Sequence, residues 1–262
     1  MPMIEGSKPF QRRTRAVERR VEFIIAGVQK GGTTALHEYL ARDKTFSLSS
    51  VKETHFFDDD THDWKNPNYD HYHAYFDWTA AGIRGETTPI YIYWPECLER
   101  IATYNPAMKI IVLLRDPVER AWSQWRMEKS RGGEVRPFSW CIRQGRQRLF
   151  ENIPWGHHRV YSYVERGYYG AQVELLLSTI NPTQVMFLKA EDLRTDPNLA
   201  LYNIYSFLGA KFRTQVPLRE VHVGVEMGDL AKDDIAHLRA LYAADDRRLR
   251  KLTGISFDRS HF

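Results

Sequence analysis

The stretch formed by residues 27–34 places a lysine, two adjacent glycines and two threonines between an apolar run and a helical pattern: Gly27-Val28-Gln29-Lys30-Gly31-Gly32-Thr33-Thr34. Adjacent glycines let the backbone approach an anion closely. The N–H groups of the first helical turn have no partner within the helix, and the helix dipole favours negative charge there. Because Lys30 adds a mobile positive charge, the pattern predicts a cradle for a phosphate-like group.

The order of residues in this loop differs from that of nucleoside triphosphatases. Their loop reads GxxxxGK[ST], with the lysine directly before the hydroxyl residue. Here Lys30 precedes the paired glycines, and no lysine stands directly before Thr33. The order therefore disfavours a magnesium-dependent nucleotide kinase, which stays the alternative enzyme class.

A second candidate site follows the apolar run 109–115, with Arg115-Asp116-Pro117 at its end and Ser123 about two helical turns further on. Ligands of open parallel sheets bind at the carboxyl ends of the strands. Arg115 offers a forked donor to a phosphate and Ser123 a hydroxyl. The alternative is that Arg115 only pairs with Glu119 or Asp116. Two phosphate sites on neighbouring strands indicate a bisphosphorylated nucleotide.

These two sites need a strand-loop-helix unit used twice. We expect strands at 21–27, 109–115 and 185–188, and helices at 33–40, 117–127, 171–177, 197–208 and about 229–252, with Asp116 as the N-cap and Pro117 as the first helical residue. Residues 43–84 show no sustained period and predict loops and short helices. Nearly continuous apolar strands followed by helices indicate an α/β protein with a parallel sheet covered on both faces.

The composition fits one large domain. The chain has 262 residues, 43% of them hydrophobic, and a net charge of +4. This excludes a disordered or fibrous protein and does not call for nucleic acid as a partner. We divide the chain into a basic N-terminal arm, 1–20, and one domain, 21–262.

The cysteines and the apolar runs bear on location. The two cysteines, Cys97 and Cys141, lie far apart and lack metal-ligand spacing, so neither a disulfide framework nor a metal site is expected. The sequence has neither a run of about 18 apolar residues nor a signal-peptide pattern. We expect a cytoplasmic protein without a membrane span.

Taken together, these motifs resemble the sulfotransferase family that uses 3'-phosphoadenosine 5'-phosphosulfate (PAPS), most closely a bacterial-type member of its heparan sulfate branch. The family's 5'-phosphosulfate loop is similar to Gln29-Lys30-Gly31-Gly32-Thr33-Thr34, and its 3'-phosphate motif to Arg115-Asp116-Pro117 followed by Arg120 and Ser123. The resemblance continues through residues 52–58, 85–91 and 187–193. The segment Arg166-Gly167-Tyr168-Tyr169 lies where family members complete the nucleotide pocket, and Tyr168 is the residue of it that we expect to bind the nucleotide.

The resemblance implies a single-domain α/β fold, a central parallel sheet flanked by helices with a P-loop-like cradle. It implies transfer of a sulfuryl group from PAPS to a hydroxyl or amine of a carbohydrate or small-molecule natural product. Adenosine 3',5'-bisphosphate is released and no metal is required. Lys30 would act at the bridging and transferred oxygens. A degenerate, non-catalytic nucleotide binder is a further alternative, and the oligomeric state is not predicted.

Glu53 matches the family's carboxylate that accepts the proton of the acceptor. We expect partial burial near Phe56 and Phe57 to raise its pKa. His55 is the competing base, although its position resembles that of a supporting residue.

His55, Asp58 and Thr87 are the expected substrate-binding residues, and Thr87 replaces a lysine common in the branch. The family's late Lys-Gly-Arg loop has no recognisable counterpart between Arg213 and Asp233.

Overall fold

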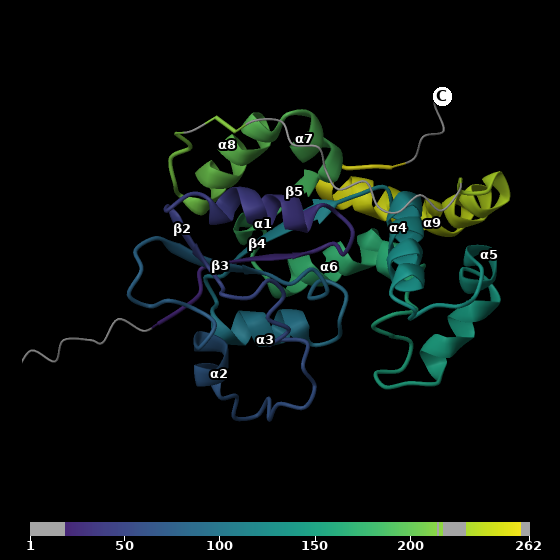
Figure 1. Ribbon diagram of the computed structural model, residues 1–262, viewed down its shortest axis with the longest axis horizontal. Coiled ribbons are helices and arrows are strands. Elements are labelled where there is room, and N and C mark those ends of the chain that lie inside the picture. The colour runs from purple at the N-terminus through teal and green to yellow at the C-terminus, as the bar shows by residue number, and fades with distance from the viewer. Residues whose placement is uncertain (1–18, 214, 217–228, 258–262) are drawn as a thin grey trace, which may run out of the picture.

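The computed structural model describes residues 19–213, 215–216 and 229–257. At the centre of this part of the chain is a five-stranded sheet of order β2-β3-β1-β4-β5, in which every neighbouring pair is parallel (Figure 1). The strands are β1 (Phe23–Gly27), β2 (Phe46–Leu48), β3 (Ile83–Thr87), β4 (Lys109–Leu114) and β5 (Val185–Lys189). The predicted α/β class with a parallel sheet is confirmed.

Helices cover both faces of this sheet (Figure 1). Phe23 and Ile25 of β1 pack on one face against helices α1, α7 and α8, whereas Ile24 and Ala26 pack on the other face against α2, α3 and α6. This alternation follows from the two-residue period of a strand, and it explains why the buried strands read as continuous apolar runs. The helices of these two layers are α1 (Thr33–Ala41), α2 (Tyr69–His73), α3 (Cys97–Tyr104), α6 (Tyr169–Thr179), α7 (Ala190–Thr195) and α8 (Pro197–Leu208).

A third apolar cluster joins α4 (Pro117–Ser130), α5 (Phe138–Cys141) and α9 (Lys232–Thr253). Within it Trp122 and Trp125 stack with ring centroids 4.8 Å apart, and Leu238 and Tyr242 of α9 are buried. The chain between α5 and α6 contains the 3-10 helices η1 (Gln144–Phe150) and η2 (Glu165–Gly167), and η3 (Pro182–Gln184) precedes β5. In Figure 1 the helices α4, α5 and α9 lie to one side of the sheet, where α4 follows β4.

The prediction of loops and short helices for residues 43–84 is wrong in part. The segment contains α2, but also β2 and the first residues of β3. β2 has only three residues, too few to show a period, and β3 includes Arg84 and Glu86, whose charges break the apolar pattern. Glu86 is nevertheless fully buried, because Thr54, Tyr72 and Thr88 donate hydrogen bonds to its carboxylate at 2.7–2.8 Å.

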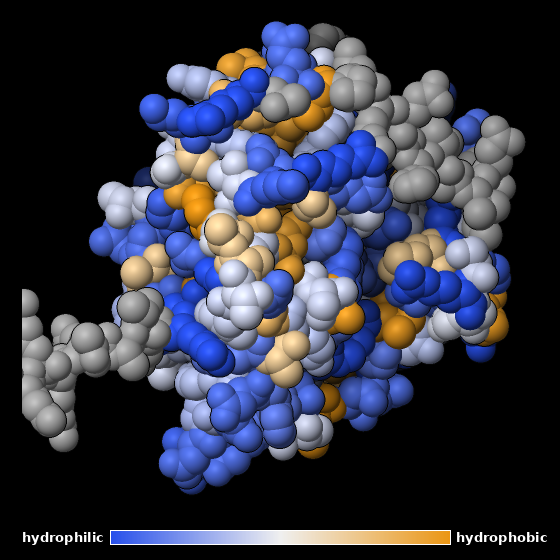
Figure 2. Space-filling model, turned by 60° about the vertical axis from the view of Figure 1, so that its left-hand side comes forward, coloured by the Kyte–Doolittle hydropathy of each residue, from blue (hydrophilic) through white to orange (hydrophobic). Residues whose placement is uncertain are grey.

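On the face shown in Figure 2, hydrophilic residues predominate, and hydrophobic residues form small separate groups among them. None of the described helices is long and apolar enough to cross a membrane. The predicted basic arm, 1–20, lies almost wholly outside the described residues, as does most of the segment between Arg213 and Asp233.

Candidate active site

Three loops meet at the carboxyl edge of the sheet, beside the ends of the neighbouring strands β3, β1 and β4; the loop at the end of β3 is the one that follows β2. The central loop follows β1 and carries Lys30, and Arg115 follows β4 and donates from Nη1 to the Lys30 carbonyl oxygen at 3.3 Å. On the other side, the Glu53 N–H donates to the carbonyl oxygen of Thr87, the last residue of β3, at 3.0 Å. The chain leaves β1 toward β2 and leaves β4 toward β5, so this is also the point where open sheets bind ligands.

Glycine is needed at Gly31 and at Gly32, in the loop after β1, for two different structural reasons. A Cβ atom on Gly31 would lie 2.6 Å from the Leu113 carbonyl oxygen and 2.8 Å from that of Val28, so the backbones leave no space for a side chain. Gly32 has a φ of 87°, in the left-handed region, and begins α1 without a side-chain cap. Among the described residues, no side chain therefore caps the N-terminus of α1, the end of a helix whose dipole favours an anion.

Lys30 lies close to positive and negative groups from several elements. Burial and the positive charges of Arg131 and Arg115 lower the pKa of Lys30, whereas Glu128 and Glu53 act in the opposite direction. The Lys30 Nζ atom is 3.7 Å from the sulfur of Met127 on α4. An anion bound here would relieve the repulsion among these three cations.

Gln29 is held by a residue that we did not predict as part of the site. The buried Arg166 donates from Nη1 to the Gln29 Oε1 atom at 2.7 Å and from Nη2 to the Arg159 carbonyl oxygen at 2.8 Å. Burial lowers the pKa of Arg166 to about 10, so the side chain stays charged at neutral pH. The signal for it is its place two residues before Tyr168, in the segment that the resemblance assigns to the nucleotide pocket.

Arg115 makes the ion pair that the sequence left open as an alternative. Its Nε and Nη2 atoms lie 3.3 Å and 3.2 Å from the same Glu119 carboxylate oxygen, in a partly exposed pair. The Asp116 carboxylate accepts from the N–H groups of Val118 and Glu119, so its predicted role as the N-cap of α4 is confirmed. Ser123 is on α4, two turns from Arg115, and is half-buried.

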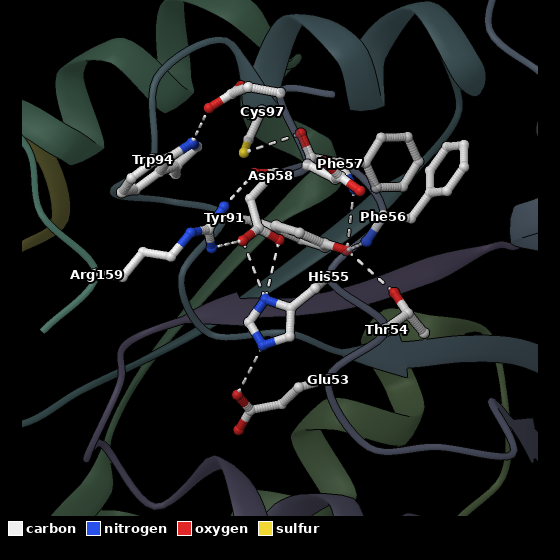
Figure 3. A network of polar contacts seen from close by, with 12 residues as sticks. Glu53, Thr54, His55, Phe56, Phe57, Asp58, Tyr91, Trp94, Cys97 and Arg159 are labelled. Atoms are coloured by element: carbon white, nitrogen blue, oxygen red, sulfur yellow. Dashed lines mark hydrogen bonds and ion pairs between the residues drawn. The ribbon is translucent and has the colours of Figure 1, made fainter. Parts of the chain in front are cut away.

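Glu53, His55 and Asp58 form a chain of contacts (Figure 3). The His55 Nδ1 atom lies 3.0 Å and 3.1 Å from the two Asp58 carboxylate oxygens, and its Nε2 atom lies 3.5 Å from a Glu53 carboxylate oxygen. Lys52 donates to the other Glu53 oxygen at 2.6 Å. Of the three expected substrate-binding residues, His55 and Asp58 therefore lie in one network with Glu53.

The prediction of a raised pKa for Glu53 is wrong. Burial alone acts in that direction, but the contacts with His55 and Lys52 outweigh it and lower the pKa of Glu53 to about 2. Phe56 and Phe57 belong to the buried aromatic cluster around Tyr72 and do not surround the carboxylate. Glu53 is therefore ionised, as a proton acceptor must be.

His55 is held in its protonated form. Hydrogen bonds with Asp58 and Glu53 raise its pKa to about 9, although burial opposes the shift. For Asp58, which is fully buried, desolvation is outweighed by the contacts with His55 and Arg159, so its pKa is lowered. An imidazolium has no free lone pair, which disfavours His55 as the base in this arrangement.

The side chains of Thr87 and Tyr168 lie elsewhere than expected. Thr87 is fully buried, and its hydroxyl lies 3.0 Å from the Nδ1 atom of His37 on α1. Its carbonyl oxygen accepts a hydrogen bond from the Glu53 N–H, so Thr87 supports the loop that carries Glu53. Its side chain points into the protein from β3 and has no exposed surface for an acceptor. The Tyr168 ring packs edge-on against Tyr242 of α9, with centroids 5.3 Å apart. Over the described residues, no three His, Cys, Asp or Glu side chains are grouped so that they could hold a metal ion.

A family model described as "Sulfotransferase domain" matches residues 20–223. The chain therefore belongs to the sulfotransferase family, a family of enzymes.

Curated relatives and a solved structure agree with this assignment. The chain is 31% identical over 192 residues to heparan sulfate glucosamine 3-O-sulfotransferase 3B1 of Mus musculus, covering 72% of this chain and 46% of the relative. It is 25% identical over 211 residues to bifunctional heparan sulfate N-deacetylase/N-sulfotransferase 3 of Homo sapiens, covering 73% of this chain and 22% of the relative. It thus spans about half the length, or less, of these relatives.

The crystal structure of a sulfotransferase from Alicyclobacillus acidocaldarius is similar, with a TM-score of 0.74 and 25% sequence identity. The match covers 91% of this chain and 98% of that one. The expected family and the expected single-domain fold are both confirmed.

Proposed function

We propose that this protein transfers a sulfuryl group from PAPS to a hydroxyl or amine of an acceptor, and that residues 21–262 form the sulfotransferase domain. The observation that carries the proposal is the row of three loops beside the carboxyl ends of β3, β1 and β4, made by the chain after β2, β1 and β4. It places an ionised carboxylate, an anion cradle with a lysine and a forked cation side by side. The carboxylate can accept the proton of the acceptor, the cradle can bind the 5'-phosphosulfate of the donor, and the arginine can bind its 3'-phosphate. The order of the three groups matches the order in which acceptor and donor would lie.

The cradle would bind the 5'-phosphosulfate. The open N-terminus of α1, Gly31, Gly32 and Lys30 face the bridging and transferred oxygens, where negative charge develops as the sulfur–oxygen bond breaks. Thr33 and Thr34 lie in the first turn of α1 and add hydroxyl groups beside it. Arg115 and Ser123 would bind the 3'-phosphate, and we assign no direct contact with the donor to Tyr168, whose ring packs against Tyr242.

Glu53 would act as the general base. The acceptor oxygen or nitrogen attacks sulfur, the bond from sulfur to the 5'-phosphate oxygen breaks, and the proton of the acceptor passes to the Glu53 carboxylate. His55 would fix this carboxylate from one side and Lys52 from the other. We assign no direct contact with the acceptor to Thr87, because its side chain is buried.

A carbohydrate is the acceptor class that the relatives favour, because the two curated relatives carry heparan sulfate in their names. A small-molecule acceptor is the second candidate. Both present a hydroxyl or amine that a carboxylate can deprotonate during attack, so the row of loops suits either.

Calorimetric titration tests the donor site without knowledge of the acceptor. The protein should bind adenosine 3',5'-bisphosphate with micromolar affinity and bind ATP with magnesium much more weakly. Magnesium-dependent ATP binding without a bisphosphate signal would favour the kinase instead. Labelled PAPS is then incubated with a desulfated heparan oligosaccharide and with 2-naphthol. Bisphosphate binding without transfer to either probe, or to water, would favour a non-catalytic binder.

A further inference from the structure

Arg159 holds the end of the Glu53–His55–Asp58 chain that lies farthest from Glu53 (Figure 3). Its Nη1 atom donates to the Asp58 carboxylate and its Nη2 atom to the Asp58 carbonyl oxygen. Asp58 is fully buried, and within the described part of the chain the other side chain that contacts its carboxylate is His55. A buried carboxylate needs such partners, since burial alone would favour its neutral form.

Arg159 is itself fixed from two further sides. Its guanidinium lies over the Trp94 ring, 4.3 Å from the centroid, and the Trp94 Nε1 atom donates to Asp60 at 2.9 Å. Its carbonyl oxygen accepts from Arg166, the same side chain that holds Gln29 in the anion cradle. The residue therefore connects the base loop with the loop that would bind the donor.

We propose that Arg159 is a positioning residue for sulfuryl transfer. It fixes Asp58 so that both carboxylate oxygens face the Nδ1 atom of His55, and this turns Nε2 toward Glu53. The proposal rests on the proposed role of Glu53 as the base. Arg159 lies 101 positions from Asp58 in the sequence, which is why the motif of residues 52–58 gives no sign of it.

The test compares Arg159→Met with a matched control, Arg248→Met. The two arginines have similar side-chain exposure, 45% and 49%, but Arg248 pairs with Glu174 on α6. In protein labelled with ¹⁵N-histidine, His55→Gln assigns the Nδ1–H signal of His55. That signal should be present in the unchanged protein and in the control and lost in Arg159→Met.

Turnover gives a second readout on whichever of the two probes, the heparan oligosaccharide or 2-naphthol, the unchanged enzyme sulfates. In Arg159→Met, kcat should fall about 10- to 100-fold while the Kd for adenosine 3',5'-bisphosphate stays the same, because a misplaced base slows chemistry and leaves the donor site intact. Added guanidinium and the Arg159→Lys variant should each restore part of the loss. A role only in folding would not respond to guanidinium.

An unchanged His55 signal in folded Arg159→Met would overturn the proposal. If that variant does not fold, Asp58→Asn combined with Arg159→Met removes the uncompensated charge, and a retained His55 signal in the double variant would refute the proposal equally. If the proposed function itself is wrong, the result is different: the unchanged protein does not bind adenosine 3',5'-bisphosphate. The His55 measurement does not depend on that result.

Discussion

Replacing Arg115 with alanine tests the 3'-phosphate site directly. A hydrogen bond to a charged group contributes about 1.5–3 kcal/mol. To bind a phosphate, however, Arg115 must give up its partly exposed pair with Glu119, which contributes about 0.5 kcal/mol. The difference, about 1–2.5 kcal/mol, predicts a Kd for adenosine 3',5'-bisphosphate that is about 5- to 70-fold weaker in Arg115→Ala.

The assay is calorimetric titration with adenosine 3',5'-bisphosphate and, in parallel, with adenosine 5'-phosphate, which lacks the 3'-phosphate. Arg115 also donates to the Lys30 carbonyl oxygen, so its loss could loosen the cradle for both nucleotides. Only the difference between the two ligands therefore reports on the 3'-phosphate. Equal loss of affinity for both would refute the assignment.

Glu119→Gln provides the reverse change. It removes the competing carboxylate charge while keeping the length of the side chain, so the bisphosphate should bind slightly more tightly, by about twofold. Weaker binding in this variant would mean that Glu119 orients Arg115 toward the ligand and does not compete with it.

Three further predictions concern the base and the cradle. Glu53→Gln should lower turnover by about 10²–10⁴-fold at unchanged bisphosphate affinity, measured by transfer from labelled PAPS; unchanged turnover would exclude Glu53 as the base. Gly31→Ala should destabilise the fold by about 1–3 kcal/mol in urea unfolding and weaken bisphosphate binding, because its Cβ would collide with the Leu113 carbonyl oxygen. A fully stable, fully binding variant would contradict the close approach. The pKa of His55 is raised from 6.5 to about 9, so its stabilisation is complete below pH 6.5 and is lost as the pH rises through 9. Between these values the unfolding temperature should fall more steeply than in His55→Gln, and parallel slopes would count against the shift.

Much of the fold could be predicted because its buried strands carry strong apolar runs. The expected strands at 21–27, 109–115 and 185–188 correspond to β1, β4 and β5, and the helix opened by Pro197 ends before Gly209. β3 could not be found this way, because hydrogen bonds to a buried Glu86 take the place of apolar packing there.

The site was predictable where the residues lie close together in sequence. The cradle and the motif with Arg115 each lie within one strand-loop-helix unit, so local pattern suffices. Arg159 and Arg166 reach the site only through the tertiary fold, and no spacing indicates their partners. The direction of the pKa shift of Glu53 was missed for the same reason, since it depends on where His55 and Lys52 point.

The row of loops also bears on how such an enzyme can diversify. On the proposed assignment, donor-binding groups follow β1 and β4, whereas the loop with Glu53 follows β2, lies against the end of β3 and is held by the segment containing Arg159. Mutations that reshape the region around the acceptor can therefore accumulate at one end of the row while the nucleotide end stays unchanged. Acceptor choice becomes a property that selection can alter separately from donor use, on one inherited scaffold.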